Sequence, residues 1–128
     1  MPHNVLVADD DVDTRIILRA VLERVGFSVL EATTADEAIA HAQRAPVDLI
    51  IVNYPMPDTD GVTIARRLRS LPAVTRVPIL NLTSRVVPQY VEQAAAEGVN
   101  LTIPKPIDIE DFIRIVHRFV SATAIPAS

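Results

Sequence analysis

The sequence predicts an α/β fold of the (βα)5 type, a five-stranded parallel sheet with helices on both faces. Short apolar runs alternate with amphipathic stretches five times along the chain, the pattern of consecutive strand–helix units. The apolar runs are almost continuous, as in strands covered on both sides, and right-handed crossovers are expected to join them. The chain has 128 residues, 49% of them hydrophobic, which is enough for one domain with a buried core.

The first strand is predicted at residues 5–8, and the first helix from Asp11 to a stop signal at Gly26. Residues 5–8 are apolar and partly β-branched, and three aspartates follow them directly. In the helical stretch, apolar and charged side chains recur on opposite faces. The inward face is predicted to carry Ile17, Leu18, Val21, Leu22 and Val25, and the opposite face Arg15, Arg19 and Glu23.

Two further strands and one helix are predicted between residues 28 and 52. Residues 28–32 read as the second strand. The sequence Thr34-Ala35-Asp36-Glu37 is a capping box, which predicts a helix that runs to Ala45 and ends before Pro46. Residues 47–52 are nearly all apolar, which predicts a central strand covered on both faces.

The remaining elements follow a polar, proline-rich loop. They are predicted at residues 61–71 (helix), 77–82 (strand), 88–97 (helix) and 100–103 (strand). Asp108 can cap a last helix. The inward face of that helix is predicted to carry Phe112, Ile115, Val116, Phe119 and Val120. Residues 123–128 lack periodicity and are expected to form a disordered tail, which leaves residues 1–122 as the domain.

Composition excludes several classes of function. The net charge of −4 argues against nucleic acid as a partner, and the absence of cysteine excludes disulfides and thiolate catalysis. Uncharged apolar runs such as residues 49–52 are too short to span a membrane. Because three aspartates follow the first run, no secretory leader is expected, and a cytoplasmic location is predicted. Ser84 has no evident His–Asp partners, so the chain is not expected to be an enzyme.

Polar residues gather where the predicted strands end. The first, third, fourth and fifth strands are followed by Asp9 and Asp10, by Asn53, by Thr83 and Ser84, and by Lys105 and Pro106. In a sheet of this type, the carboxyl ends of the strands form one rim at which ligands bind. Paired carboxylates suit a hard cation, whereas a lysine and a hydroxyl suit phosphoryl oxygens. Any one of these groups alone would fit an ordinary turn, but together they predict a site for a divalent cation and a phosphoryl group.

From residue 4 to residue 121, the sequence resembles the receiver domains of two-component response regulators, including the single-domain chemotaxis type. The resemblance is carried by the opening Val-Leu-Val-Ala-Asp-Asp-Asp, by Met56-Pro57-x-x-x-Gly61, by Leu82-Thr83-Ser84 and by Lys105-Pro106. It implies a flavodoxin-like or CheY-like, doubly wound fold with strand order 2-1-3-4-5. It also implies a role in phosphorelay signal transduction.

The resemblance assigns roles to individual positions. It implies that Asp9, Asp10 and the Pro55 carbonyl bind Mg²⁺, and that Thr83 and Lys105 contact the phosphoryl group. It also implies a cis peptide bond between Lys105 and Pro106.

Two positions depart from the pattern of the family. The residue that accepts the phosphoryl group in receivers is an aspartate, but here it is Asn53, whose carboxamide has no anionic oxygen to act as a nucleophile. With one carboxylate fewer, Mg²⁺ is expected to bind weakly at most. Three residues before the lysine, receivers typically carry an aromatic switch residue, but here the residue is Thr102.

Two hypotheses follow from these departures. The chain is either a pseudo-receiver that works by protein–protein interaction, or an ordinary phosphoaccepting receiver that carries an Asp-to-Asn substitution at position 53. Thr102 and Pro104 favour the first, because a single introduced change would leave the rest of the machinery standard. The second is favoured by the survival of Asp9, Asp10, Thr83 and Lys105.

In receivers, partners dock on the surface formed by the last two helices and the strand between them. Apolar side chains in this region are Tyr90 and Val91 on the first of these helices and Ile109 and Ile113 on the second. A wide core stripe accounts for them equally well. The partner expected on this surface is a sensor histidine kinase, a downstream signalling protein or a second copy of the chain.

Overall fold

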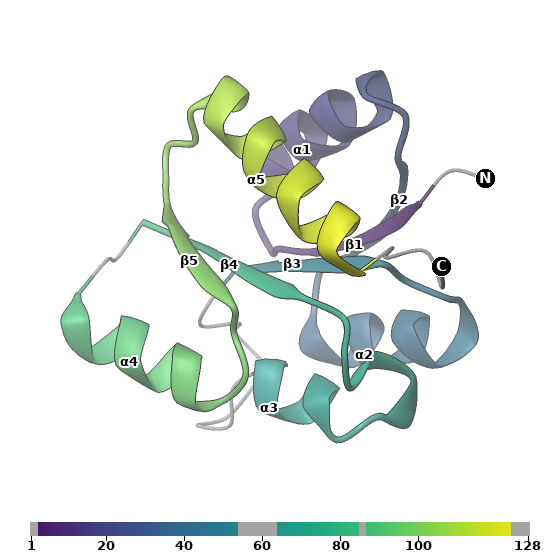
Figure 1. Cartoon of the computed structure of the whole chain (residues 1–128), viewed down its shortest axis with the longest axis vertical. Helices are drawn as coiled ribbons and strands as arrows, with labels where there is room; N and C mark the ends of the chain where they lie inside the picture. Colours follow the sequence, from purple (N-terminus) through teal and green to yellow (C-terminus); the bar gives the residue numbers. More distant parts are fainter. Residues whose placement is uncertain (1–2, 54–63, 85–86, 124–128) are drawn as a thin grey trace.

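The computed structural model of the chain describes residues 3–53, 64–84 and 87–123. Its five parallel strands form one sheet in the order β2-β1-β3-β4-β5, and Figure 1 shows helices packed against both faces of this sheet. The predicted fold class and strand order are therefore confirmed. Helices α1 and α5 cover one face, and α2, α3 and α4 cover the other (Figure 1).

The elements alternate along the chain as predicted. They are β1 (Asn4–Ala8), α1 (Val12–Arg24), β2 (Ser28–Ala32), α2 (Ala35–Arg44), β3 (Leu49–Asn53), α3 (Ile64–Arg69), the 3-10 helix η1 (Pro72–Val74), β4 (Ile79–Thr83), α4 (Pro88–Ala96), β5 (Leu101–Pro104) and α5 (Ile109–Thr123). Residues 61–63 of the predicted third helix and residues 124–128 of the predicted tail lie outside the described residues. Helix α5 extends to Thr123, the first residue assigned to that tail.

Local capping signals explain where three of the helices begin. The side chain of Asp11 accepts a hydrogen bond from the Thr14 backbone N–H, and Thr34 accepts one from the backbone N–H of Glu37. Asp108 accepts in the same way from the backbone N–H of Asp111, over 3.0 Å. Each cap satisfies a backbone donor that has no partner within its helix, so the polar residue fixes the first turn.

The sheet separates two hydrophobic cores, and the central strands contribute alternate side chains to each. The core under α2 and α3 receives Leu6, Ala8, Ile50 and Val52, and the core under α1 and α5 receives Val5, Val7, Leu49 and Ile51. All eight side chains are fully or almost fully buried. The continuous apolar runs in β1 and β3 therefore reflect burial on both faces, as predicted.

One expectation about α1 is wrong. Leu18 and Leu22 are buried as predicted, but Ile17 is 47% exposed. Successive helical residues are about 100° apart, so a helix that directs Leu18 at the sheet turns Ile17 toward its margin. The charged face is only partly exposed to solvent, since Arg15 and Arg19 are half-buried. Their Nε atoms donate to the carboxylate of Glu31 on β2, at 3.1 and 2.5 Å.

Candidate functional site

The polar residues predicted to share one rim do lie at the carboxyl ends of neighbouring strands. Asp9 and Asp10 follow β1, Asn53 ends β3, Thr83 ends β4, and Lys105 follows β5. The register aligns these ends, because β1 pairs with β3, β3 with β4, and β4 with β5 in parallel. The topology thus brings together five side chains that are up to 96 positions apart in the sequence.

Asp9 is the most deeply buried acid at this rim, with only 1% of its surface exposed. Its Oδ2 atom pairs with Nζ of Lys105 at 3.0 Å, and its Oδ1 atom accepts the Asp11 backbone N–H at 2.9 Å. Its carbonyl oxygen accepts a hydrogen bond from Nη1 of Arg15, at 2.8 Å. A carboxylate this deeply buried needs such partners, since an unpaired buried charge is strongly disfavoured.

Asn53 forms a direct contact with the second acid of the pair. Its Nδ2 atom donates to Oδ1 of Asp10 over 2.9 Å. A carboxylate can only accept, so the amide must present its NH₂ group to Asp10. A carboxylate at position 53 would instead repel Asp10, by roughly 4 kcal/mol for two charges ~4 Å apart at an effective dielectric constant of about 20. The amide therefore replaces repulsion with a hydrogen bond.

The residues at this rim fit a divalent cation only in part. Asp9 and Asp10 supply two carboxylates, the number that Mg²⁺ commonly takes from a protein. Across residues 3–53, 64–84 and 87–123, however, no group of three or more acidic or histidine side chains is placed to hold a metal ion. Lys105 and Asn53 already engage the two carboxylates, and the predicted third ligand, Pro55, lies outside the described residues. The donor set that remains is that of a weak site.

Thr83 and Thr102, which correspond to the two switch positions of receivers, lie on adjacent strands. Thr83 is buried, and its carbonyl accepts the backbone N–H of Lys105 at 2.9 Å. The Lys105–Pro106 peptide bond is cis. Thr102 is half-buried, and its Oγ1 atom lies 3.5 Å from Nδ2 of Asn81, its register partner on β4. Small polar groups therefore occupy the place where the family resemblance implies an aromatic ring.

Asn81 is a polar residue that the sequence reading missed. It is only 1% exposed, and among the described residues its Oδ1 atom has no hydrogen-bond partner. An amide within the apolar run of residues 77–82 was the available signal, because buried polar groups normally have a partner elsewhere in the fold.

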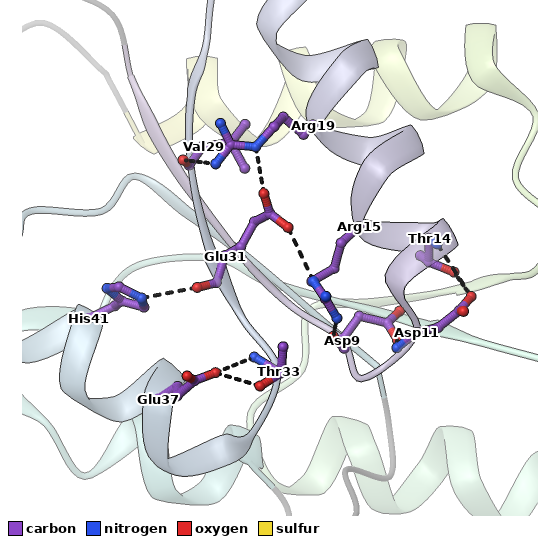
Figure 2. A network of polar contacts seen from close by, with 10 residues as sticks. All are labelled: Asp9, Asp11, Thr14, Arg15, Arg19, Val29, Glu31, Thr33, Glu37 and His41. Atoms are coloured by element: carbon purple, nitrogen blue, oxygen red, sulfur yellow. Dashed lines mark hydrogen bonds and ion pairs between the residues drawn. The ribbon is translucent and has the colours of Figure 1, made fainter.

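A charged network next to the rim was also missed. Figure 2 shows Glu31 between the two arginines of α1, with Arg15 reaching on to Asp9. The contact with Glu31 is the main reason why the pKa of Arg19 is raised. Arg15 thus connects the rim to β2 at the edge of the sheet. The sequence indicated a charged helical face here, but not the glutamate that it contacts.

The four residues predicted as a docking surface lie on opposite faces of the sheet. Tyr90 and Val91 are half-buried on α4. Ile109 and Ile113 line a groove of about 170 Å³ between α5 and α1, and Ile109 is 48% exposed. Figure 1 shows α4 and α5 on the two faces, with β5 at the edge between them. No helix within the described part of the chain is long and apolar enough to cross a membrane.

Comparisons with known proteins agree with this geometry. The model of the response regulator receiver domain family matches residues 5–117. The chain is 34% identical, over 119 residues, to an uncharacterized 14.6 kDa protein in the sodA1 3′ region of Leptolyngbya boryana; the match covers 93% of this chain and 91% of that protein. It is 35% identical over 109 residues to the transcriptional regulatory protein ResD of Bacillus subtilis, covering 85% of this chain but only 44% of ResD.

Two solved structures show the same fold. Chemotaxis protein CheY4 of Vibrio cholerae is 28% identical with a TM-score of 0.87, and the match covers 93% of this chain and 99% of CheY4. The receiver domain of the sensor histidine kinase PA1611 of Pseudomonas aeruginosa is 25% identical with a TM-score of 0.85, covering 94% of this chain and 99% of that domain. The PA1611 domain has a magnesium ion coordinated in its active site cleft.

Proposed function

The chain belongs to the response regulator receiver domain family of two-component signalling, and we propose that it acts as a pseudo-receiver. In this role it binds a signalling protein without accepting a phosphoryl group. The observation that carries the proposal is Asn53, whose amide donates to Asp10 at the end of β3. An acyl phosphate requires a carboxylate nucleophile at this position, and a carboxamide cannot form one.

The remaining rim residues support a binding role. Lys105 is paired with Asp9, and Asn53 donates to Asp10, so both carboxylates of the rim have a donor from this chain, although two carboxylates face one ammonium. Asp9 and Asp10 are the residues that would hold Mg²⁺, and the ion would supply charge compensation there. We expect weak binding, because Lys105 and Asn53 compete for the same carboxylates.

The partner that we propose is a sensor histidine kinase or a downstream signalling protein. The proposed contact surface consists of α4, β5 and the adjoining end of α5. Val87 and Leu101 add exposed apolar area to Tyr90 and Val91 in this region. Because no acyl phosphate shifts the fold between two states, binding is constitutive and is controlled by the amount of protein or by the partner.

A phosphodonor experiment tests the proposal. The chain is incubated with Mg²⁺ and either acetyl phosphate or a phosphorylated kinase, and covalent labelling is measured by mass spectrometry. We expect no adduct on the chain with Asn53 and none on the control variant Asn53→Ala. A hydroxylamine-sensitive adduct on any aspartate of the rim contradicts the proposal. A partner that binds several-fold more tightly in the presence of beryllofluoride contradicts it as well.

The second candidate function is an ordinary phosphoaccepting receiver in which Asn53 stands in place of a natural aspartate. It is favoured by the retention of Asp9, Asp10, Thr83 and Lys105 around the rim. Under this reading, Asn53→Asp gains both labelling and tight Mg²⁺ binding, and the codon at position 53 of the native gene encodes aspartate. An asparagine codon together with an unlabelled Asn53→Asp variant favours the pseudo-receiver instead.

A further inference from the structure

Helix α4 lies over a buried amide, the side chain of Asn81 on β4. Side chains alternate along a strand, so Asn81 faces the same side of the sheet as Ile79, which shares a core with Ala94 of α4. The Oδ1 atom of Asn81 is buried and has no hydrogen-bond partner among the described residues. Its Nδ2 atom lies 3.5 Å from Oγ1 of Thr102, at the long limit of a hydrogen bond. Burial of an oxygen without a partner destabilises the closed structure, and that loss is recovered when water reaches the atom.

The helix itself buries little apolar surface against the sheet. All nine residues of α4 are described, and Ala94 is the one buried residue among them. Tyr90 and Val91 are half-buried. Helix α5, by contrast, buries a phenylalanine and two valines. Because the stabilisation from burial scales with the apolar area removed from water, α4 is held to the sheet less strongly than α5.

The beginning of α4 also lacks local signals that stabilise a first turn. Its N-cap residue is Val87, whose side chain cannot accept a hydrogen bond, and its first turn contains no acidic residue. Helices α1 and α2 begin instead with Asp11 and Thr34, whose side chains each accept a backbone N–H. Helix α4 therefore begins with less local support than either of these helices.

The other end of α4 is bound to its surroundings by several hydrogen bonds. Arg69, the last residue of α3, donates from Nε and Nη2 to the carbonyl of Gly98, at 3.2 and 2.9 Å. The backbone N–H of Val99 donates to the carbonyl of Ala94 at 2.9 Å. The helix thus has a weakly held beginning and a firmly held end.

We propose that α4 opens as a unit about its C-terminal end while the rest of the domain stays folded. The opening brings water to Oδ1 of Asn81, and the contacts between Arg69 and Gly98 stay closed and act as the hinge. No phosphoryl group takes part in this motion. Because α4 belongs to the proposed contact surface, a partner that prefers one of the two states would shift the equilibrium between them; this last consequence rests on the proposed function.

Amide hydrogen exchange of the whole chain, followed by NMR at a series of low urea concentrations, tests the opening. We expect the amides of α4 to be protected at least about tenfold less than those of β1 and β3, and to depend little on urea, because a local opening exposes little surface. Protection should rise from Val91 toward Val99. Exchange of α4 together with β1 and β3, with the same urea dependence, overturns the proposal, and so does the opposite gradient. No phosphodonor is used, so a failure here is separate from a failure of the proposed function.

Two variants test the cause of the opening. Asn81→Val removes the unpartnered oxygen and should slow the exchange of the α4 amides about tenfold. Asn100→Val is the matched control: Oδ1 of Asn100 accepts from the Ile79 backbone N–H at 2.8 Å and from Arg69 at 2.9 Å, so the same substitution should speed exchange. Val87→Asp alters no buried side chain, and by capping the helix it should slow exchange in α4 about fivefold. Exchange in α4 that neither Asn81→Val nor Val87→Asp slows overturns the proposal.

Discussion

The contact between Asn53 and Asp10 depends on a single nitrogen atom. The amide donates to a carboxylate that can accept but cannot donate, and Asp9 beside it is held in turn by Lys105. Each acid of the pair therefore has a donor from this chain. Both acids are thus hydrogen-bonded without an added cation, which is a property of these particular side chains and not of the fold.

Replacing Asn53 with aspartate should remove the hydrogen bond to Asp10 and destabilise the rim. In the presence of a chelator, Asn53→Asp should lower the free energy of unfolding by about 1–3 kcal/mol, because a hydrogen bond is lost and two carboxylates are brought together. Mg²⁺ should restore much of the loss by binding the folded state. Urea unfolding with EDTA and with Mg²⁺ measures both effects. If the chain with Asn53 gains as much stability from Mg²⁺ as the variant does, this account is contradicted.

Two glycines permit a matched comparison of backbone strain and crowding. Gly26 and Gly98 both have positive φ angles, +99° and +114°. A Cβ atom at Gly26 would meet nothing within 4 Å, whereas one at Gly98 would lie 2.7 Å from Cγ of Arg69. Gly26→Ala should therefore cost only the backbone strain, about 1–2 kcal/mol. Gly98→Ala should cost clearly more, and equal losses in thermal unfolding would contradict the crowding argument.

At the scale of secondary-structure elements, Arg69 joins segments that the sequence separates. Its guanidinium donates to the carbonyls of Gly98 and Val77, at 2.9 and 2.6 Å, and to Oδ1 of Asn100 at 2.9 Å. Burial lowers the pKa of Arg69 below its ordinary value. The end of α3 is thereby fastened to the turn between α4 and β5 and to the segment that enters β4.

The beginning of α2 should respond to acid. The hydroxyl of Thr33 donates to Glu37 at 2.7 Å and its backbone N–H donates at 2.6 Å, which lowers the pKa of Glu37. Because the pKa is lower in the folded state, the stabilisation is present at neutral pH and is lost as the pH falls through that pKa. Glu37→Gln should therefore be less stable than the natural chain at pH 7, with the difference narrowing in acid.

The titration of Glu37 can be followed directly by NMR. Thr33→Val removes the hydroxyl donor while keeping the shape of the side chain, so the pKa of Glu37 should rise toward its ordinary value. A Glu37 pKa that is unchanged in this variant would show that another group causes the shift.

The comparison of prediction with structure shows which signals are local. Caps such as Thr34 and Asp108 act within one turn, so the sequence located the starts of α2 and α5 to within a residue. The apolar run at residues 47–52 predicted β3 too early: Val47 is buried, but the paired strand begins at Leu49. Burial and strand pairing are different constraints, and an apolar run in the sequence predicts burial but not where strand pairing begins.

The candidate site was predictable where topology alone determines position. Once the (βα)5 order is known, Asp9, Asn53 and Lys105 must meet at one rim. Which hydrogen-bond partners these residues have depends on the distances between side chains from segments far apart in the sequence. The Asn53–Asp10 contact spans 43 positions, and the Arg69–Gly98 contact spans 29. No local pattern in the sequence encodes such pairs.

On the scale of the whole molecule, the sheet divides the interior into two cores. Ile51 faces the core under α1 and α5, and Ile64 belongs to the core under α2 and α3. Ile51→Val and Ile64→Val should each cost about 0.5–1.5 kcal/mol. Because they lie on opposite sides of the sheet and share no cluster, the double variant should show the sum within about 0.5 kcal/mol. A larger deviation in urea unfolding would mean that the two cores are coupled through the sheet.

The two edges of the sheet also bear on how the protein behaves at high concentration. On the outer side of β2, the carbonyls of Val29 and Glu31 are bound by side chains of Arg19 and His41, at 3.2 and 3.0 Å, and Figure 2 shows both contacts. At the other edge β5 has only four residues, and the last of them, Pro104, has no N–H to donate. A strand from another molecule would find few free backbone groups at either edge. Fibre growth by strand addition is therefore disfavoured, even though the sheet is rich in valine and isoleucine.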